Sequence, residues 1–261
     1  PARIASEHVA RVTDADTDPE LGDAPFYVME LLRGRDLEKI IHEDGPIAPP
    51  LAVEYLRQAS RALDKAHAAG IVHRDLKPEN LFLTHRDDGS PCIKLLDFGI
   101  ARLADAEGQS QLKTQAGFVF GTPGFMSPEQ MIGEVDKIGP AADIWALGLV
   151  AFRIMVARDF WKSTSPAALC AEILTAPIPP PSELGATLGP AFDAWFARCV
   201  TRTIEERFKT AGEAVTALAV ALGVRLEGPR SATSLVAAHE FVGPPSFRGQ
   251  VASSPSVPGV P

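Results

Sequence analysis

The stretch that most constrains the fold is Ile71–Leu83, in which a polar loop is enclosed by two short apolar runs. The loop presents a carboxylate, an ammonium group and an amide within six residues, at Asp75, Lys77 and Asn80. Such a set suits phosphoryl transfer, because the Asp can accept a hydroxyl proton, the Lys can neutralise a phosphate and the Asn can bind a divalent metal. The alternative interpretation is a polar turn between two strands, which is common for any one of these residues.

A second carboxylate follows in Lys94–Arg102, which reads Lys-Leu-Leu-Asp-Phe-Gly-Ile-Ala-Arg. Most Asp-Phe-Gly tripeptides are only turns, and the glycine permits one here. Asp97 comes seventeen residues after Asn80, however, and Asp88-Gly89 between them is a hairpin signal. The hairpin would return Asp97 to the first loop, so Asn80 and Asp97 are candidate metal ligands on either side of one site.

Two further motifs stand later in the chain. The segment Gly121–Glu129 reads Gly-Thr-Pro-Gly-Phe-Met-Ser-Pro-Glu, and Asp143-Ile-Trp-Ala-Leu-Gly opens the run Ala141–Val156. That run is apolar nearly all round and therefore predicts a buried central helix. Each motif alone could be an ordinary loop or helix start, but the order and spacing of all four make coincidence a poor explanation.

Together these motifs resemble the carboxy-terminal lobe of a eukaryotic-like protein Ser/Thr kinase, of the kind that bacteria also encode. The resemblance covers roughly residues 8–222, and Lys77 is the residue typical of Ser/Thr rather than Tyr kinases. It implies an α+β, protein-kinase-like fold with a mostly helical C-lobe and a remnant of the N-lobe sheet. The implied domains are an N-lobe remnant with the hinge at 1–32, the C-lobe at 33–222 and a disordered tail or linker at 223–261.

The resemblance implies ATP and Mg²⁺ as cofactors and a role for each residue of the loop. Asp75 is the catalytic base and Lys77 stabilises the transferring phosphate. Asn80 and Asp97 hold magnesium. Thr122 is similar to the threonine that bonds the catalytic Asp and Lys in Ser/Thr kinases.

Other implied roles concern the nucleotide and the framework of the lobe. Met29 is the gatekeeper, and the backbone of Glu30–Leu32 is the hinge that meets adenine. Asp36 contacts the ribose, and Phe82 lies under the adenine ring. In the framework, Glu129 is expected to pair with Arg207. Asp143 is expected to accept backbone hydrogen bonds from the catalytic loop.

A regulatory site is also expected in the activation segment. Arg74 and Arg102 would form a cationic pocket that a phosphate could neutralise. Phe118 stands where many kinases place an activating threonine. We therefore expect Thr114 to be the activating phosphosite, with Ser110 second and Thr122 unmodified.

The sequence also departs from the family pattern. No Gly-x-Gly-x-x-Gly precedes the hinge, and the first lysine is Lys39, which follows it. We therefore expect this chain to show little or no activity by itself. One alternative is a kinase-like interaction module without catalysis, although four intact catalytic residues argue against it. Another is a small-molecule phosphotransferase, which would not need the peptide-holding segment Gly121–Glu129.

Composition restricts the partners. The net charge of −8 argues against nucleic acid or an anionic membrane as the main partner. Three widely spaced cysteines predict no disulfide framework or metal site, and no apolar run is long enough to span a membrane. We expect protein substrates with Ser or Thr and a cytoplasmic location, or the cytosolic part of a membrane-anchored protein. A homodimer that phosphorylates itself in trans is left open.

The pattern of apolar residues predicts the remaining elements. A strand is expected at His8–Val12, a turn at Asp14–Ala24 and a strand from Phe26 to Leu32. The hairpin strands are expected at Leu81–Thr84 and Cys92–Leu96. Besides a short helix capped by Asp36, helices are expected at Leu51–Ala69, Pro166–Thr175, Pro190–Val200 and Ala211–Leu222.

Overall fold

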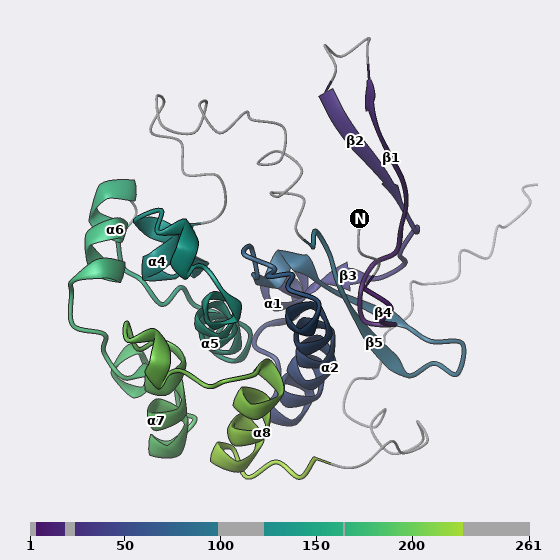
Figure 1. Ribbon diagram of the computed structural model, residues 1–261. Coiled ribbons are helices and arrows are strands. Elements are labelled where there is room, and N and C mark those ends of the chain that lie inside the picture. Colours follow the sequence, from purple (N-terminus) through teal and green to yellow (C-terminus); the bar gives the residue numbers. More distant parts are fainter. Residues whose placement is uncertain (1–3, 19–23, 99–122, 164, 227–261) are drawn as a thin grey trace, which may run out of the picture. The chain divides into compact units, whose positions relative to one another are not determined.

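The strands form two small antiparallel sheets, and helices α1 (Leu37–Asp44) and α2 (Pro49–Ala68) lie in the sequence between the first and second strands of the second sheet (Figure 1). In one sheet, β1 (Val12–Asp18) pairs with β2 (Ala24–Met29). In the other, the order is β3 (Arg35–Asp36), β4 (Leu81–His85) and β5 (Pro91–Leu95). The computed structural model describes residues 4–18, 24–98, 123–163 and 165–226, so the predicted tail lies outside the described residues from 227 onward.

The predicted turn at Asp14–Ala24 is wrong in its first part. β1 continues through Asp18, which pairs with Ala24, while Val12 pairs with Met29. Six of the seven side chains in β1 are exposed. A strand exposed on both faces need not alternate apolar and polar residues, so this pattern gave no strand signal. The predicted strand at His8–Val12 is reduced to an isolated parallel bridge between Val9 and Leu95.

The hairpin of β4 and β5 agrees with the sequence. Leu81 pairs with Leu95 and His85 with Pro91. Gly89 has a φ of 79°, a left-handed conformation that glycine adopts without a steric penalty. The hairpin therefore places the end of β5 beside the start of β4, where the polar loop ends.

The helices begin and end within a few residues of their predicted bounds. The first, α1 (Leu37–Asp44), starts at Asp36, whose carboxylate accepts a hydrogen bond from the Lys39 backbone as predicted. The others are α2 (Pro49–Ala68), α4 (Pro128–Met131), α5 (Pro140–Val156), α6 (Pro166–Leu174), α7 (Pro190–Cys199) and α8 (Ala211–Ala221). Short 3₁₀ turns lie between them, at η2 (Pro78–Asn80), η4 (Pro123–Phe125), η5 (Val135–Lys137), η6 (Pro181–Leu184) and η7 (Ile204–Glu206).

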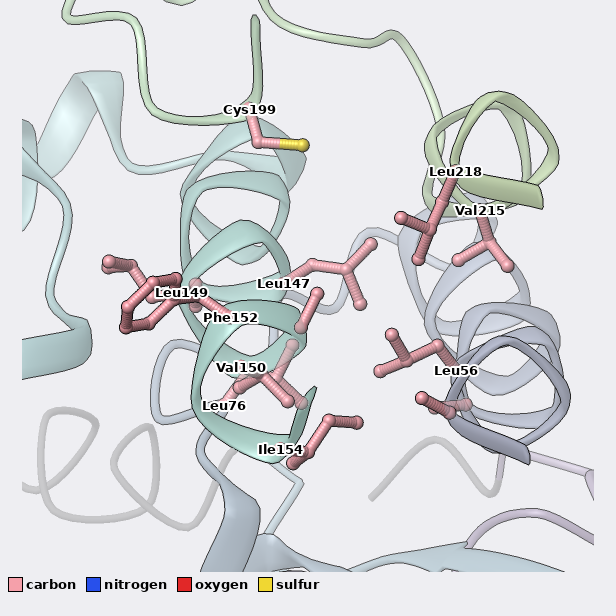
Figure 2. Packing of buried hydrophobic residues seen from close by; sticks show 14 of the residues in the cluster. Leu56, Leu76, Leu147, Leu149, Val150, Phe152, Ile154, Cys199, Val215 and Leu218 are labelled. Carbon is pink, nitrogen blue, oxygen red and sulfur yellow. The ribbon is translucent and has the colours of Figure 1, made fainter. Parts of the chain in front are cut away.

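The core forms around α5, as its apolar composition predicts. This helix packs against α2, α7 and α8. Figure 2 shows Leu147 of α5 pointing toward α2 and α8, from which Leu56, Val215 and Leu218 face it. All four side chains are at most 1% exposed, and burial of each contributes about 1.5–3 kcal/mol to the stability of the fold. Among the described helices, none is long and apolar enough to cross a membrane.

Helices α5 and α7 approach closely at one point. A Cβ atom added at Gly148 of α5 would lie 2.6 Å from Cβ of Cys199 in α7. That distance is far below van der Waals contact, so the crossing requires a glycine. Cys199 is completely buried there as a free thiol.

Candidate active site

The polar loop brings three predicted catalytic side chains together. Oδ2 of Asp75 forms an ion pair with Lys77 Nζ at 2.9 Å and accepts a hydrogen bond from Asn80 Nδ2 at 3.0 Å. Asn80 Nδ2 also donates to the Asp75 backbone carbonyl at 2.7 Å. The Asp75 side chain is 43% exposed. Its Oδ1 atom therefore remains available to accept a proton from an incoming hydroxyl.

A buried carboxylate at the start of α5 fixes the backbone of this loop. Asp143 is 1% exposed and accepts hydrogen bonds from the backbone N–H groups of His73 and Arg74, both at 2.9 Å. A third bond comes from His67 Nε2 on α2, at 2.7 Å. These bonds hold Arg74 in a left-handed conformation with a φ of 68°. The predicted contact between Asp143 and the catalytic loop is therefore present.

His73 connects the loop to the strand that carries the second carboxylate. Its Nε2 atom donates to the carbonyl of Leu96 at 2.8 Å, and its Nδ1 atom accepts a 3.3 Å bond from the Asp75 backbone. The Leu96 N–H group donates to the Asn80 carbonyl at 2.9 Å. Asp97 is the next residue, so the structure brings the two candidate metal ligands to neighbouring positions.

Asp97 makes a contact that the sequence does not indicate. The Tyr27 hydroxyl, from β2, donates to Asp97 Oδ1 at 2.5 Å. Burial raises the pKa of Tyr27 to about 12, and the Asp97 carboxylate adds to this effect. The phenol is consequently a hydrogen-bond donor throughout the physiological pH range. Asp97 itself is exposed and has a φ of 57°.

The donors at this site suit a hard divalent cation. Asn80 uses its amide nitrogen for Asp75, which leaves its carbonyl oxygen for a cation, and Asp97 supplies a carboxylate oxygen. Within the described residues, no group of three or more His, Cys, Asp or Glu side chains could hold a metal ion. Mg²⁺ commonly takes one or two protein oxygens and completes its shell with water and substrate phosphates. Two oxygen donors therefore fit Mg²⁺.

Comparison with known proteins agrees with this geometry. The protein kinase domain model matches residues 2–210. The chain belongs to the protein kinase family. One relative is the serine/threonine-protein kinase Pkn1 of Myxococcus xanthus, which is 36% identical over 84% of this chain and 30% of the relative. The serine/threonine-protein kinase PknB of Mycolicibacterium smegmatis is 32% identical over 95% of this chain and 39% of the relative.

A solved structure shows the same kinase fold. The kinase domain of PknI from Mycobacterium tuberculosis has a TM-score of 0.62, with 21% identity, and the match covers 84% of this chain and 74% of that domain. The predicted α+β protein-kinase-like fold is thus confirmed. The chain spans between about a third and two fifths of the length of the kinases Pkn1 and PknB.

The predicted hinge follows β2. Glu30 accepts hydrogen bonds from Lys94 Nζ of β5 at 2.8 Å and from the Arg11 backbone at 3.0 Å. Burial raises the pKa of the Glu30 carboxyl, but these hydrogen bonds outweigh burial and leave it lowered. The next residue, Leu31, is 89% exposed. The side chain of Glu30 thus fastens the hinge to β5, while the backbone continues in the open.

The other predicted nucleotide contacts lie on either side of this hinge. Met29 ends β2, Leu32 closes the hinge, and Phe82 lies in β4, where it pairs with Asp36 of β3. Asp36 already uses one carboxylate oxygen to cap α1. A Cβ atom at Gly34 would lie 1.9 Å from the Leu83 carbonyl oxygen, so the chain can cross β4 here only as glycine.

Of the predicted regulatory residues, the structure describes Arg74. Arg74 has a buried Nε atom without a hydrogen-bond partner among the described residues. Its backbone carbonyl accepts a 2.7 Å bond from Gln130 of α4. The predicted residues Arg102, Ser110, Thr114 and Thr122 lie outside the described residues.

The predicted ion pair of the C-lobe is present. Arg207 donates from Nη1 to Glu129 Oε1 at 2.7 Å and from Nη2 to Oε2 at 3.0 Å. Arg207 also donates to the carbonyls of Thr201 and Ala141, both at 2.9 Å, and its guanidinium lies 5.1 Å from the Trp145 ring centroid. The pair anchors α4, whose first two residues are the last two of the segment Gly121–Glu129 that is predicted to hold a peptide.

Sequence reasoning missed three contributors to the site. Tyr27, Gln130 and His67 contact Asp97, Arg74 and Asp143 respectively, across 70, 56 and 76 residues of sequence. No local pattern marks them, because each acts only through its tertiary partner. For Gln130 a partial signal existed, since Ser127 and Gln130 have the spacing of a capping box.

Proposed function

We propose that this chain carries the phosphotransfer centre of an ATP-dependent protein Ser/Thr kinase, which moves the γ-phosphate of ATP to Ser or Thr of a protein substrate. The observation that supports this most strongly is that Asp75 Oδ2 forms an ion pair with Lys77 and also accepts a hydrogen bond from Asn80. It leaves one exposed carboxylate oxygen beside an ammonium group, as in-line transfer to a hydroxyl requires.

Each residue then has one task. Asp75 orients the substrate hydroxyl and accepts its proton. Lys77 lies beside it and neutralises charge on the transferring phosphate. By the family resemblance Thr122, which is outside the described residues, would bond both. Asn80 and Asp97 would hold Mg²⁺, which would offset the negative charge of the ATP phosphates.

The nucleotide contacts follow from the hinge. The backbone of Glu30–Leu32 would bond adenine, with Met29 behind the ring, Phe82 beneath it and Asp36 near the ribose. The ion pair between Glu30 and Lys94 supports this assignment, because it fixes the hinge side chain. The Glu30 N–H group donates to the Arg11 carbonyl at 2.9 Å, so the bonds to adenine would come from the other hinge backbone groups. We assign residues 1–32 to the nucleotide lobe and hinge, 33–222 to the C-lobe and 223–261 to a linker or tail.

The substrate and location follow from the same centre. A protein substrate suits the anchored segment that ends at Glu129, and nucleic acid is disfavoured by the net charge of −8. We infer a cytoplasmic location, either free or as the cytosolic part of an anchored protein. ATP as donor and the three free thiols at Cys92, Cys170 and Cys199 support it. A homodimer for phosphorylation in trans is compatible with this scheme.

A kinase-like interaction module is the second candidate. One observation favours it, namely that no lysine precedes Lys39 in the 261 residues. Such a module would have no physical need of the contacts that Asp75 makes with Lys77 and Asn80, so we rank it below the enzyme.

Transfer of labelled phosphate from ATP to a general protein substrate tests the proposal. The assay uses the full natural reading frame that contains these residues, as wild type, Asp75→Asn and Asp159→Asn. Loss of the proton acceptor should reduce the rate about 10²- to 10⁴-fold. Asp159, whose side chain is 84% exposed, is the matched control and should leave the rate unchanged. An Asp75→Asn protein with wild-type activity would exclude the assigned chemistry, and a wild type that binds partners without transfer would favour the interaction module.

A further inference from the structure

Tyr27 contacts the centre from the other sheet. Its phenol oxygen lies 2.5 Å from Asp97 Oδ1, which is the length of a charge-assisted O–H···O⁻ hydrogen bond. Tyr27 occupies the middle of β2, opposite Ala15 of β1, and lies two residues before Met29. Residues two apart share one face of a strand, so Tyr27 lies on the face of β2 that also carries Met29.

Asp97 needs such a partner. It is exposed, and its backbone is left-handed at a φ of 57°. It directly follows Leu96, whose N–H group donates to the Asn80 carbonyl. An exposed carboxylate has no packing to select a rotamer. Among the described residues, the Tyr27 hydroxyl is the hydrogen-bond donor to the Asp97 side chain.

The bond to Tyr27 occupies one carboxylate oxygen and leaves the other. Oδ1 accepts a hydrogen bond from the phenol hydroxyl, so the rotation of the carboxylate is restrained while Oδ2 stays available to a cation. Ligating carboxylates are commonly restrained in this manner by hydrogen bonds from residues that do not touch the metal, and loss of such a bond typically costs 10- to 100-fold in affinity.

We propose that Tyr27 is a positioning residue for the divalent cation, because its hydroxyl orients Asp97 so that Oδ2 can bind the cation together with Asn80. The inference rests on the proposed function, which makes Asp97 a ligand. It adds a functional link between the β1–β2 hairpin and the metal. Displacement of the hairpin from Asp97 would weaken cation binding even with Asp97 and Asn80 intact.

The chain offers a matched control, because it contains only two tyrosines. Tyr55 lies in α2, is 8% exposed, and has no side-chain hydrogen bond among the described contacts. Mn²⁺ alone serves as the probe, and free Mn²⁺ is measured by electron paramagnetic resonance in titrations of the 261-residue chain. Wild type, Tyr27→Phe, Tyr55→Phe and Asp97→Asn are compared, each after circular dichroism has shown an unchanged helical spectrum.

Tyr27→Phe should weaken Mn²⁺ binding about 10-fold, Tyr55→Phe should match wild type, and Asp97→Asn should remove the site. An affinity of Tyr27→Phe equal to wild type would show that the contact does not position Asp97. A higher affinity would show that Tyr27 competes with the cation. Either result overturns the inference while the metal site stands. If Asp97→Asn binds as wild type does, the cation is not at Asp97, and the proposed metal site fails as well.

A second readout uses the wild-type protein and so does not depend on a variant. With ¹³Cζ-labelled tyrosine the chain gives two resonances, assigned from the two Phe variants. Mn²⁺ should broaden the Tyr27 resonance at concentrations that leave Tyr55 sharp, since Tyr27 touches the ligand. Equal broadening of both, or of neither, would place the cation away from this contact and overturn the inference.

Discussion

Arg207 and Glu129 form a bidentate ion pair in which the arginine is completely buried and the glutamate is 3% exposed. Every guanidinium nitrogen of Arg207 donates to a carboxylate or a carbonyl. A buried pair with this geometry is costly to break, because removal of one partner leaves the other charged and without a partner. The pair joins α4 to the residues just before α8.

Arg207→Ala should therefore destabilise the protein strongly. A loss of about 3–5 kcal/mol corresponds to a melting temperature lower by about 6–20 °C for a domain of this size. Thermal unfolding followed by circular dichroism measures it. Lys137→Ala is the control, because it removes a pair with Glu134 whose side chains are 59% and 41% exposed, and such pairs contribute about 0–1 kcal/mol. Equal melting temperatures for Arg207→Ala and wild type would mean that the pair is absent in solution.

The same pair predicts a pH dependence. Burial by itself raises the pKa of Glu129, but the hydrogen bonds and charge of Arg207 outweigh burial and hold that pKa below its ordinary value. A carboxyl whose pKa is lower in the folded state stabilises the fold above its unfolded pKa of about 4.3, and this contribution is lost as pH falls through the folded pKa.

The stability difference between wild type and Glu129→Gln should consequently be largest near pH 7 and shrink below about pH 4. Urea denaturation of both proteins at a series of pH values measures it. A difference that stays constant down to pH 3 would contradict a lowered pKa for Glu129.

The close approach of α5 and α7 gives a third prediction. Gly148→Ala would place a Cβ atom 2.6 Å from Cβ of Cys199, and such overpacking costs about 1–3 kcal/mol. Removal of the opposing Cβ in the double variant Gly148→Ala/Cys199→Gly should restore part of that stability. A double-mutant cycle from urea denaturation gives the coupling. Purely additive effects would show that the two positions do not clash.

Much of this architecture could be predicted from local sequence. Asp75, Lys77 and Asn80 stand within six residues, and the loop that they form is bonded within itself, so the sequence alone brings them together. The apolar run of α5 and the Asp36 cap are equally local signals. These features depend on spacing along one segment, which a sequence displays directly.

Other features depend on the meeting of distant segments. β1 has no alternating pattern, because its exposed residues face solvent on both sides, and its strand conformation comes from pairing with β2. Tyr27 gains its significance only from Asp97, seventy residues later. An ordinary tyrosine in a strand gives no sign of that contact, so the sequence could not predict it.

The 261-residue chain should bind ATP weakly. Leu31 of the hinge is 89% exposed, Phe26 and Val28 of β2 are 45% and 46% exposed, and no lysine precedes Lys39 to contact the phosphates. Little of the adenine surface would then be removed from water. We expect a dissociation constant of about 1 mM or weaker by calorimetry, with phosphotransfer near background. Micromolar affinity, or strong autophosphorylation of these residues alone, would contradict this expectation.

The last prediction concerns activation, and it starts from Arg74. The buried Nε atom of Arg74 has no hydrogen-bond partner among the described residues, and its backbone is fixed by Asp143 and Gln130. A phosphate would bring close to two negative charges and several oxygen acceptors to such a guanidinium. Thr114, which follows Lys113, is the nearest hydroxyl upstream of Thr122 in the sequence, and Ser110 is the next. All four lie outside the described residues.

Mass spectrometry of the protein from the full natural reading frame after incubation with Mg-ATP should find phosphate on Thr114, less on Ser110 and none on Thr122. Thr114→Ala should then lower activity toward an added substrate, whereas Ser110→Ala should have a smaller effect. Arg74→Lys keeps the charge but loses the planar fork that binds phosphate, so it should reduce the gain in activity that phosphorylation brings. If Thr114 carries no phosphate, or if Thr114→Ala retains full activity, Arg74 does not act through this residue.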